Sequence, residues 1–375
     1  MNIPILDLKK EYTFLKNDIT AQLKSCFKNQ QWILGNKVEA FEKRAAKYLK
    51  VKYAVGVASG TDALILSLEA LALKLRSKPQ FSAKDEIITT PFTFLATAES
   101  IVRSGATPVF VDINPDTFNI DTLSIKKAIT KNTVGIIPVH LYGQACEMDE
   151  ISKIAKEYNL FVVEDAAQAF GAEYKNRKVG TFGNCGAFSF FPSKNLGAFG
   201  DAGLISTNDG RLSELLKMLR NHGQVRQYDA SFIGHNSRLD AIQAAVLTAK
   251  LKYIDKFNTL RKKVAYEYDK VFSDVKEIEA PFSPDYNRHI YHLYTIKVAS
   301  NRNKLLKHLN SAGVQARIYY PVPLYEMKAF KSAIFKKPYK GAEDALSKVI
   351  SLPIYPFLAK GQIKHIIKSI VDFFA

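Results

Sequence analysis

The chain has 375 residues, of which 47% are hydrophobic and 24% are charged, as is usual for a globular protein in water. That length suffices for one large domain and a smaller one. No run approaches the roughly 20 apolar residues of a membrane span, and residues Met1–Lys10 lack the apolar stretch of a secretion signal. The three scattered cysteines, Cys26, Cys146 and Cys185, form no close redox or metal-binding pair, which favours a reducing, cytoplasmic setting.

The formal net charge is +17, but the basic residues are spread along the chain with only mild clusters such as Arg261-Lys262-Lys263. A nucleic-acid binder usually concentrates them on one face or arm. The pattern therefore favours a lysine-rich solvated surface and no nucleic-acid partner. A milder functional interpretation is attraction of an anionic small substrate, such as a nucleotide diphosphate, into a positive cleft.

Between about residue 36 and residue 220, short apolar strands alternate with helical patterns. In chain order the patterns predict a helix over 38–49, a strand over 53–57, a helix over 62–75, a strand over 86–89, a helix over 94–103, strands over 108–111 and 134–139, a helix over 148–157 and a strand over 160–163. This alternation is typical of a mostly parallel central sheet covered by helices, the α/β class.

After residue 250 the pattern changes. Residues 239–261 resemble one long helix, residues 294–298 a strand, and prolines become more frequent. We therefore predict a large domain over 1–250, including an N-terminal arm, and a smaller α+β domain over 251–375.

One lysine and one carboxylate follow apolar strands. The strand that starts at Gly186 ends in a turn carrying Lys194, and the strand around Val162-Val163 ends on Asp165. A lysine that can form a Schiff base, with an aspartate for the protonated pyridine nitrogen, is what pyridoxal 5'-phosphate (PLP) requires. A lysine in such a place is on its own usually a surface residue, so the pair carries this prediction.

A third segment, Ala58-Ser59-Gly60-Thr61-Asp62, joins a predicted strand to a predicted helix. Gly60 permits close backbone approach, Thr61 offers a hydroxyl, and the first helical N–H groups form an anion site. A simple helix cap is the alternative. The spacing of glycines matches neither a dinucleotide fold nor an NTPase loop.

Together these segments resemble the DegT/DnrJ/EryC1 family of PLP-dependent nucleotide-sugar aminotransferases. The likeness rests on four motifs, which are Ala58–Leu64, Glu164–Gln168, Ser189–Lys194 and Gly234–Ala245. The resemblance implies an aspartate-aminotransferase-like fold (PLP fold type I) with a smaller α+β C-terminal domain.

The resemblance also implies residue roles. Lys194 would hold PLP and move the proton, Asp165 would pair with the pyridine nitrogen, and Gln168 would hydrogen-bond the ring hydroxyl. Further cofactor contacts are expected from Gly60, Thr61 and Ser189 at the phosphate, from Phe92 stacked on the ring, and from Asn236 of a second subunit. Without the family, Phe92 would be an ordinary core aromatic and Asn236 a turn residue. Asn236 makes the expected active site one that a homodimer shares.

The regiochemistry is inferred from two segments. Residues 195–203 and Arg220–Gln224 resemble the branch of the family that acts on 3-keto sugars. The expected acceptor is a dTDP-3-keto-6-deoxyhexose, with UDP-3-keto-N-acetylglucosaminuronate or a 4-keto nucleotide sugar as alternatives. Arg238 is either an anion-steering residue or a structural ion-pair partner. Tyr325 stands where many relatives carry histidine, which leaves the sugar open.

The resemblance implies a two-step transamination for amino-sugar and polysaccharide biosynthesis. L-glutamate is the expected amino donor, and pyridoxamine phosphate carries the amino group between the steps. Family dehydratases replace the lysine with histidine, so Lys194 argues against that activity. A non-catalytic regulatory relative is the distant alternative. His289 and His292 have no carboxylate or cysteine set beside them, so no metal site is predicted.

Overall fold

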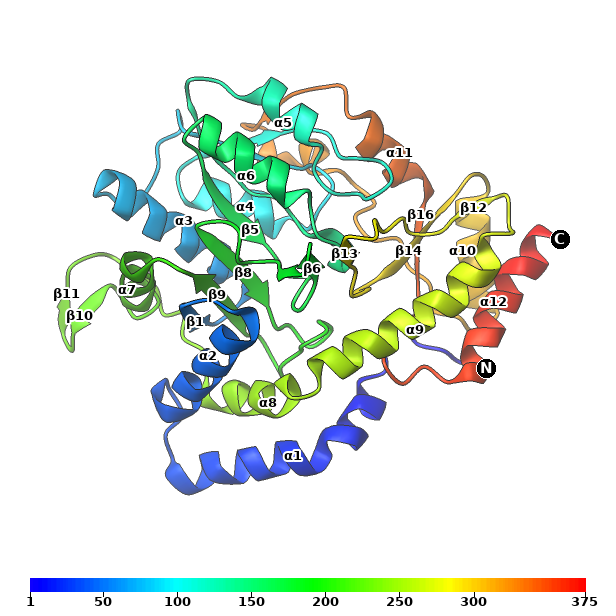
Figure 1. Ribbon diagram of the computed structural model, residues 1–375, viewed down its shortest axis with the longest axis horizontal. Helices are drawn as coiled ribbons and strands as arrows, with labels where there is room; N and C mark the ends of the chain where they lie inside the picture. The colour runs from blue at the N-terminus through cyan, green and yellow to red at the C-terminus, as the bar shows by residue number, and fades with distance from the viewer.

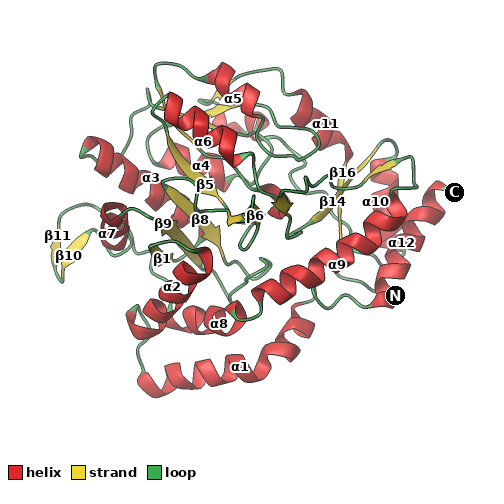
Figure 2. Ribbon diagram, viewed as in Figure 1, coloured by secondary structure: helices red, strands yellow, loops and turns green.

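The computed structural model describes residues 1–375 and is built around an eight-stranded sheet (Figures 1 and 2). Only β9 runs against the others, so the sheet is mostly parallel. In spatial order its strands are β1 (Tyr53–Val57), β9 (Gly203–Thr207), β8 (Cys185–Ser189), β5 (Phe161–Asp165), β4 (Thr133–Ile136), β2 (Glu86–Thr89), β3 (Thr107–Phe110) and β15 (Ile334–Phe335).

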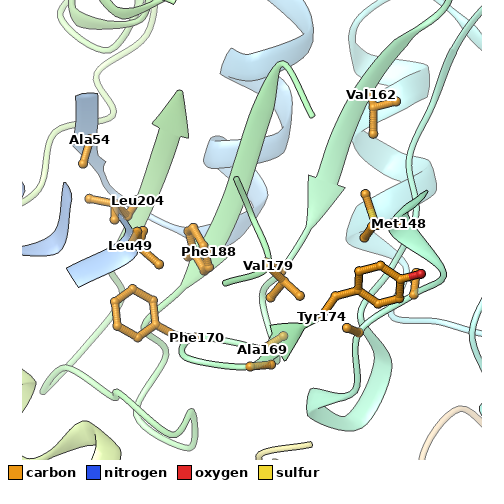
Figure 3. Packing of buried hydrophobic residues seen from close by; sticks show 14 of the residues in the cluster. Leu49, Ala54, Met148, Val162, Ala169, Phe170, Tyr174, Val179, Phe188 and Leu204 are labelled. Atoms are coloured by element: carbon orange, nitrogen blue, oxygen red, sulfur yellow. The ribbon is translucent and has the colours of Figure 1, made fainter. Parts of the chain in front are cut away.

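Helices cover both faces of this sheet because side chains along each strand alternate between two cores. In β5, Val162 belongs to one buried cluster while Phe161 and Val163 belong to the other. Helices α2 (Gly35–Leu49), α5 (Thr122–Ala128), α6 (Met148–Glu157) and α8 (Ala241–Leu251) contribute to the first cluster, part of which is shown in Figure 3. Helices α3 (Gly60–Arg76), α4 (Ala96–Arg103) and α7 (Gly210–Leu219) contribute to the second.

The C-terminal part has its own antiparallel sheet and core. Its strands are β12 (Ile278–Glu279), β14 (Tyr294–Val298) and β16 (Val349–Leu352), with β14 in the centre. Helices α9 (Ile254–Phe272), α10 (Arg302–Ser311) and α12 (Lys360–Phe374) pack on it. The remaining α-helices and strands are α1 (Leu8–Asn29), α11 (Lys340–Lys348), β6 (Glu173–Tyr174), β7 (Arg177–Lys178), β10 (Gln224–Arg226), β11 (Asp229–Ala230) and β13 (Asn287–Arg288).

The predicted long helix over 239–261 is wrong, because α8 ends at Leu251 and α9 begins at Ile254. Tyr253, between them, has φ −111° and ψ 0° and so leaves the helical conformation. Its hydroxyl donates to Asp18 of α1 at 2.6 Å, and its ring packs edge-on against Phe14. Contacts with α1 thus set the angle between the two helices.

Three pairings cross the predicted domain boundary at residue 250. Ile3 forms a β-bridge with Val314, β13 pairs with β6, and β15 adds to the large sheet beside β3. The amino-terminal residues therefore pack within the small core, and a C-terminal strand belongs to the large sheet. None of the helices combines the length and apolar character needed to cross a membrane.

Candidate active site

Most of the residues predicted to bind the cofactor or to take part in catalysis lie at one edge of the large sheet. Asp165 ends β5 and Ser189 ends β8, and these two parallel strands are neighbours. Parallel strands present their carboxyl ends at the same edge, where ligands bind in α/β sheets. A cavity of about 560 Å³ lies there, and its lining includes Gly60, Thr61, Asp165, Gln168, Ser189 and Lys194.

Asp165 is a buried carboxylate without a cationic partner in contact. One oxygen accepts a hydrogen bond from the Thr97 hydroxyl at 2.7 Å, and the other accepts one from the Ala167 N–H at 3.2 Å. Burial raises the pKa of this carboxyl, while the positive charge of Lys194 opposes that shift. The carboxylate is therefore oriented and leaves room for a cation in the cavity.

Lys194 lies in the turn that follows β8. Its N–H donates to the Phe191 carbonyl at 2.8 Å, which closes the turn. The next residue, Asn195, donates to Asn258 at 2.8 Å and to the Ile290 carbonyl at 3.1 Å, which anchors the turn to α9 and the C-terminal part. Desolvation lowers the pKa of Lys194 to about 8, although Asp165 opposes this shift. About one tenth of this lysine is therefore a neutral, nucleophilic amine at pH 7, a far larger fraction than for a lysine of ordinary pKa.

The third component is the amino end of α3. Ser59 caps it, with its hydroxyl oxygen accepting from the Asp62 N–H at 3.0 Å. The N–H groups of Gly60 and Thr61 precede the first intrahelical bond and have no acceptor within the helix. Gly60 also lies against β8, because a Cβ there would sit 2.6 Å from the Cβ of Ser189. These groups form a cradle suited to an anion.

The side chain of Gln168 is held by hydrogen bonds to two tyrosines. Its side-chain oxygen accepts from the Tyr142 N–H at 2.8 Å, and its amide nitrogen donates to the Tyr320 hydroxyl at 2.6 Å. Both tyrosines have positive φ, 56° and 62°, which is uncommon for residues other than glycine. The second N–H of the amide has no protein acceptor and remains available for a ligand.

The prediction that Phe92 lines the site is wrong. Phe92 is fully buried and packs against the rings of Phe118, Tyr142 and Tyr320 in an aromatic core. Two residues later, Phe94 is 54% exposed and lines the cavity. Both rings follow β2, but Phe92 turns into the core between the two sheets while Phe94 turns toward the cavity.

Asn236 lies outside the cavity lining of its own chain. Its side chain is exposed, and its backbone is bridged to Asn221. Arg238 donates to the Asn221 side chain at 3.2 Å and has no ion-pair partner. Tyr325 is also absent from the cavity wall, since its ring stacks on Tyr339 with centroids 4.8 Å apart.

Several lining residues were not predicted. They come from distant segments, and they are Ile5 and Leu6, Arg261 on α9, His292 and Leu293, Tyr319 and Tyr320, and Ile354. His292 was considered only as a metal ligand, yet its ring nitrogen Nδ1 lies 3.2 Å from Asn195 Oδ1. The structure brings together no group of three or more side chains able to hold a metal ion.

Comparison with protein-family models matches residues 14–371 to the DegT/DnrJ/EryC1/StrS aminotransferase family. The chain belongs to this family. It is 41% identical to the pleiotropic regulatory protein of Geobacillus stearothermophilus, over 100% of this chain and 99% of that one. It is 40% identical to the UDP-2-acetamido-2-deoxy-3-oxo-D-glucuronate aminotransferase of Pseudomonas aeruginosa, over 99% and 100%. It is 39% identical to the dTDP-3-amino-3,6-dideoxy-alpha-D-galactopyranose transaminase of Aneurinibacillus thermoaerophilus, over 98% of each.

Solved structures agree with this assignment. DesV of S. venezuelae, in complex with a ketimine intermediate, superposes with a TM-score of 0.94 at 37% identity, over 99% of this chain and 98% of that one. NtdA of Bacillus subtilis, with bound cofactor PMP, superposes with a TM-score of 0.90 at 31% identity, over 100% and 85%. The fold is that of the PLP type I aminotransferases, as predicted.

Proposed function

We propose that this aminotransferase uses PLP to move an amino group from L-glutamate to a 3-keto nucleotide-diphosphate sugar. The observation that carries the proposal is the placement of Lys194, Asp165 and the amino end of α3 on one cavity. The relatives described above support the acceptor class, since two of them are named for 3-keto or 3-amino nucleotide sugars.

The residues on the cavity wall fit the cofactor. Asp165 is a buried carboxylate lacking a cation, which suits a protonated ring nitrogen. The free N–H groups of Gly60 and Thr61, with Ser189 beside them, suit the phosphate. Gln168 has a free amide N–H for the ring hydroxyl, and Phe94 supplies an exposed aromatic face. When bound, PLP supplies an electron-withdrawing ring that accepts the electrons released as Cα loses its proton.

Two side chains carry the chemistry that the protein itself supplies. The Nζ atom of Lys194 would attack the cofactor's aldehyde as a free amine, and once released it would move a proton between the Cα carbon of the amino donor and the C4' carbon of the cofactor. Asp165, held by Thr97, would keep the ring nitrogen protonated. The aromatic and apolar wall, including Phe94 and Leu293, would exclude water from these steps.

A homodimer with shared active sites is part of the proposal. Asn236 is exposed and lies outside the cavity of its own chain, so a cofactor contact by it requires a second chain. The neighbouring hairpin of β10 and β11 projects from the body of the molecule (Figure 1). Tyr228 and Ile233 on this segment are 91% and 89% exposed, as expected for residues that a partner covers.

Within the class of 3-keto nucleotide sugars, we propose a particular sugar and nucleotide. A dTDP-3-keto-6-deoxyhexose is the leading acceptor, and the UDP-linked 3-keto uronate is the alternative. Relatives named for a dTDP sugar and for a UDP sugar are 39% and 40% identical to this chain, respectively.

The test is a reverse half-reaction followed by visible absorbance of the PLP-loaded protein. Matched 3-amino and 4-amino sugars, on dTDP and on UDP, are added separately. We expect the band of the lysine-bound cofactor to bleach with 3-amino sugars alone, and faster with one of the two nucleotides. Lys194→Ala is the matched control and should show no such band.

The other outcomes are equally informative. Bleaching by 4-amino sugars alone would keep the aminotransferase and overturn the regiochemistry. A protein that binds no PLP, and whose Lys194→Ala variant keeps its biological role, would refute the catalytic proposal in favour of a regulatory relative.

A further inference from the structure

Arg261 brings a guanidinium group to the wall of the cavity. It comes from the middle of α9, only 2% of its surface is exposed, and it lies beside His292 and Ile354 in the cavity lining. Buried arginines are normally paired with an acid, because an isolated buried charge is costly.

Arg261 has no acidic partner. Its Nη1 donates only to backbone carbonyls, to Ile354 at 2.7 Å, to Tyr291 at 3.3 Å and to His292 at 3.5 Å. Its buried Nε atom has no hydrogen-bond partner, and its Nη2 makes no hydrogen bond within the chain. Desolvation lowers the pKa of Arg261 to about 10, which leaves it charged at neutral pH.

Other buried cations in the chain are neutralised within the protein. Arg220, 7% exposed, pairs with Glu42 at 2.5 Å, and Lys250, 3% exposed, pairs with Glu11. The two acids on the cavity wall, Asp165 and Asp201, make no ion pair with Arg261. Glu11 is the one acid whose charge raises the pKa of Arg261, but it is already paired with Lys250, so no acid contacts the Arg261 guanidinium.

The position of Arg261 limits which anion it can meet. His292 lies between the two cations, because its carbonyl oxygen is 3.5 Å from Arg261 Nη1 and its Nδ1 is 3.2 Å from the side chain of Asn195, the residue after Lys194. An anion bound at Arg261 would thus occupy the cavity that Lys194 also lines. The phosphate cradle at Gly60 and Thr61 is formed by a different element, α3.

We propose that Arg261 forms a carboxylate subsite for a group carried by one of the two substrates. This rests on the proposed function and extends it to substrate recognition. A guanidinium presents parallel N–H donors that match a carboxylate. The carboxylate is either the α-carboxylate of the amino donor or, in a uronate acceptor, the carboxylate at C-6.

The experiment compares Arg261→Gln and Arg261→Lys with the unaltered, PLP-loaded protein in separate half-reactions. Four ligands are titrated against the visible band: L-glutamate, its 1-amide, a 3-amino uronate nucleotide sugar, and the 6-deoxy counterpart of that sugar. If the donor is the source, Arg261→Gln should raise the half-saturating concentration of L-glutamate roughly 30-fold or more. The response to the 1-amide should change little, and Arg261→Lys should restore part of the affinity.

A control separates the subsite from the loss of an arginine that donates to a backbone carbonyl. Arg302, on α10, donates to the Leu346 carbonyl at 2.5 Å and lies outside the cavity. Arg302→Gln should leave every titration unchanged. If Arg261→Gln does not fold, the ratio of L-glutamate to 1-amide affinity in the unaltered protein, and its change in Arg261→Lys, test the same proposal.

The titrations either identify which substrate carries the carboxylate that Arg261 binds or refute the carboxylate subsite. Weakened binding of the uronate sugar alone would assign Arg261 to the C-6 carboxylate. Unchanged binding of both L-glutamate and the uronate sugar, or an equal loss for the uronate sugar and its 6-deoxy counterpart with L-glutamate unaffected, would refute the carboxylate subsite. Because all titrations require the visible band, a protein without that band fails the proposed function rather than this inference.

Discussion

The side chain of Lys194 lies in surroundings that no surface lysine has. It is half-buried beside the carboxylate of Asp165, and its pKa is lowered to about 8 because desolvation outweighs that attraction. The consequence is kinetic, since only the uncharged amine has the lone pair needed to attack a carbonyl group.

We therefore predict that cofactor capture depends on pH around that value. Below pH 8 the ammonium form dominates, so the capture rate should rise about tenfold per pH unit and then level off above it. Stopped-flow growth of the visible band, after mixing the cofactor-free protein with PLP, measures this. A rate that keeps rising past about pH 9.5 would indicate an ordinary lysine pKa.

Phe92 and Phe94 form a matched pair with opposite expected roles. Phe92→Ala removes a fully buried ring and should lower the free energy of unfolding by about 3–5 kcal/mol. Phe94→Ala removes an exposed ring and should change it by less than about 1 kcal/mol. Loss of stacking should instead weaken PLP binding about 2- to 10-fold.

Urea unfolding and PLP titration of both variants check this pair. The opposite pattern, with Phe92→Ala stable but impaired in PLP binding, would restore the role that the sequence suggested for Phe92.

At the scale of elements, the segment that carries Asn236 is fastened to α3. His235 Nε2 lies 2.8 Å from Glu69 on that helix, and the hydrogen bond to Glu69 raises the pKa of the histidine. A raised pKa means that protonated His235 stabilises the folded state. That contribution is complete below the unfolded pKa of about 6.5 and is lost as the pH rises through the folded value.

The expected result is a pH-dependent effect of Glu69→Gln. Its destabilisation should be largest below about pH 6.5 and shrink above it, reaching no more than about 1 kcal/mol because His235 is partly exposed. Thermal unfolding at several pH values measures it. Glu214→Gln, which breaks an exposed pair with Arg211, is the control and should show no such trend. A constant difference for Glu69→Gln across the range would contradict the assignment.

Elements that bury alternating apolar residues were predictable from the sequence. The strands 53–57, 86–89 and 294–298 and the helix 148–157 have the predicted bounds, because a buried strand or amphipathic helix carries its own periodic signal. The break at Tyr253 was not predictable, since no glycine or proline marks it and its cause is a contact with α1.

The candidate site likewise contains residues whose position could be predicted from the sequence and residues whose position could not. Lys194 and Asp165 follow apolar strands, and parallel strands bring their carboxyl ends together, so their meeting could be predicted. Arg261 lies in a helix whose sequence resembles that of any charged surface helix, and only packing against residues 291, 292 and 354 places it at the cavity. The inward turn of Phe92 is likewise a property of the packed core.

At the scale of the whole molecule, the proposal of shared active sites predicts complementation between two inactive variants. Lys194→Ala lacks the amine, and Asn236→Asp places a negative charge where a phosphate is expected. In a mixed dimer, one of the two sites would combine an intact lysine with an intact asparagine. Random exchange of subunits should therefore restore about one quarter of the unaltered activity.

The measurement is transaminase activity after the two variants are mixed under conditions of subunit exchange. Size-exclusion chromatography with light scattering verifies the dimer. Mixtures no more active than their components would place Asn236 and Lys194 in the same site of one chain, or outside any shared site.

The amino terminus has a practical consequence for all of these measurements. Ile5 and Leu6 line the cavity, and Ile3 is held to Val314. Met1 is four residues ahead of Ile5 and so no more than about 14 Å from it along the chain. An affinity tag placed ahead of Met1 would sit beside the substrate chamber and would alter the affinities being compared. A tag placed after Ala375 extends from α12, none of whose residues lines the chamber, and is the neutral choice for purification.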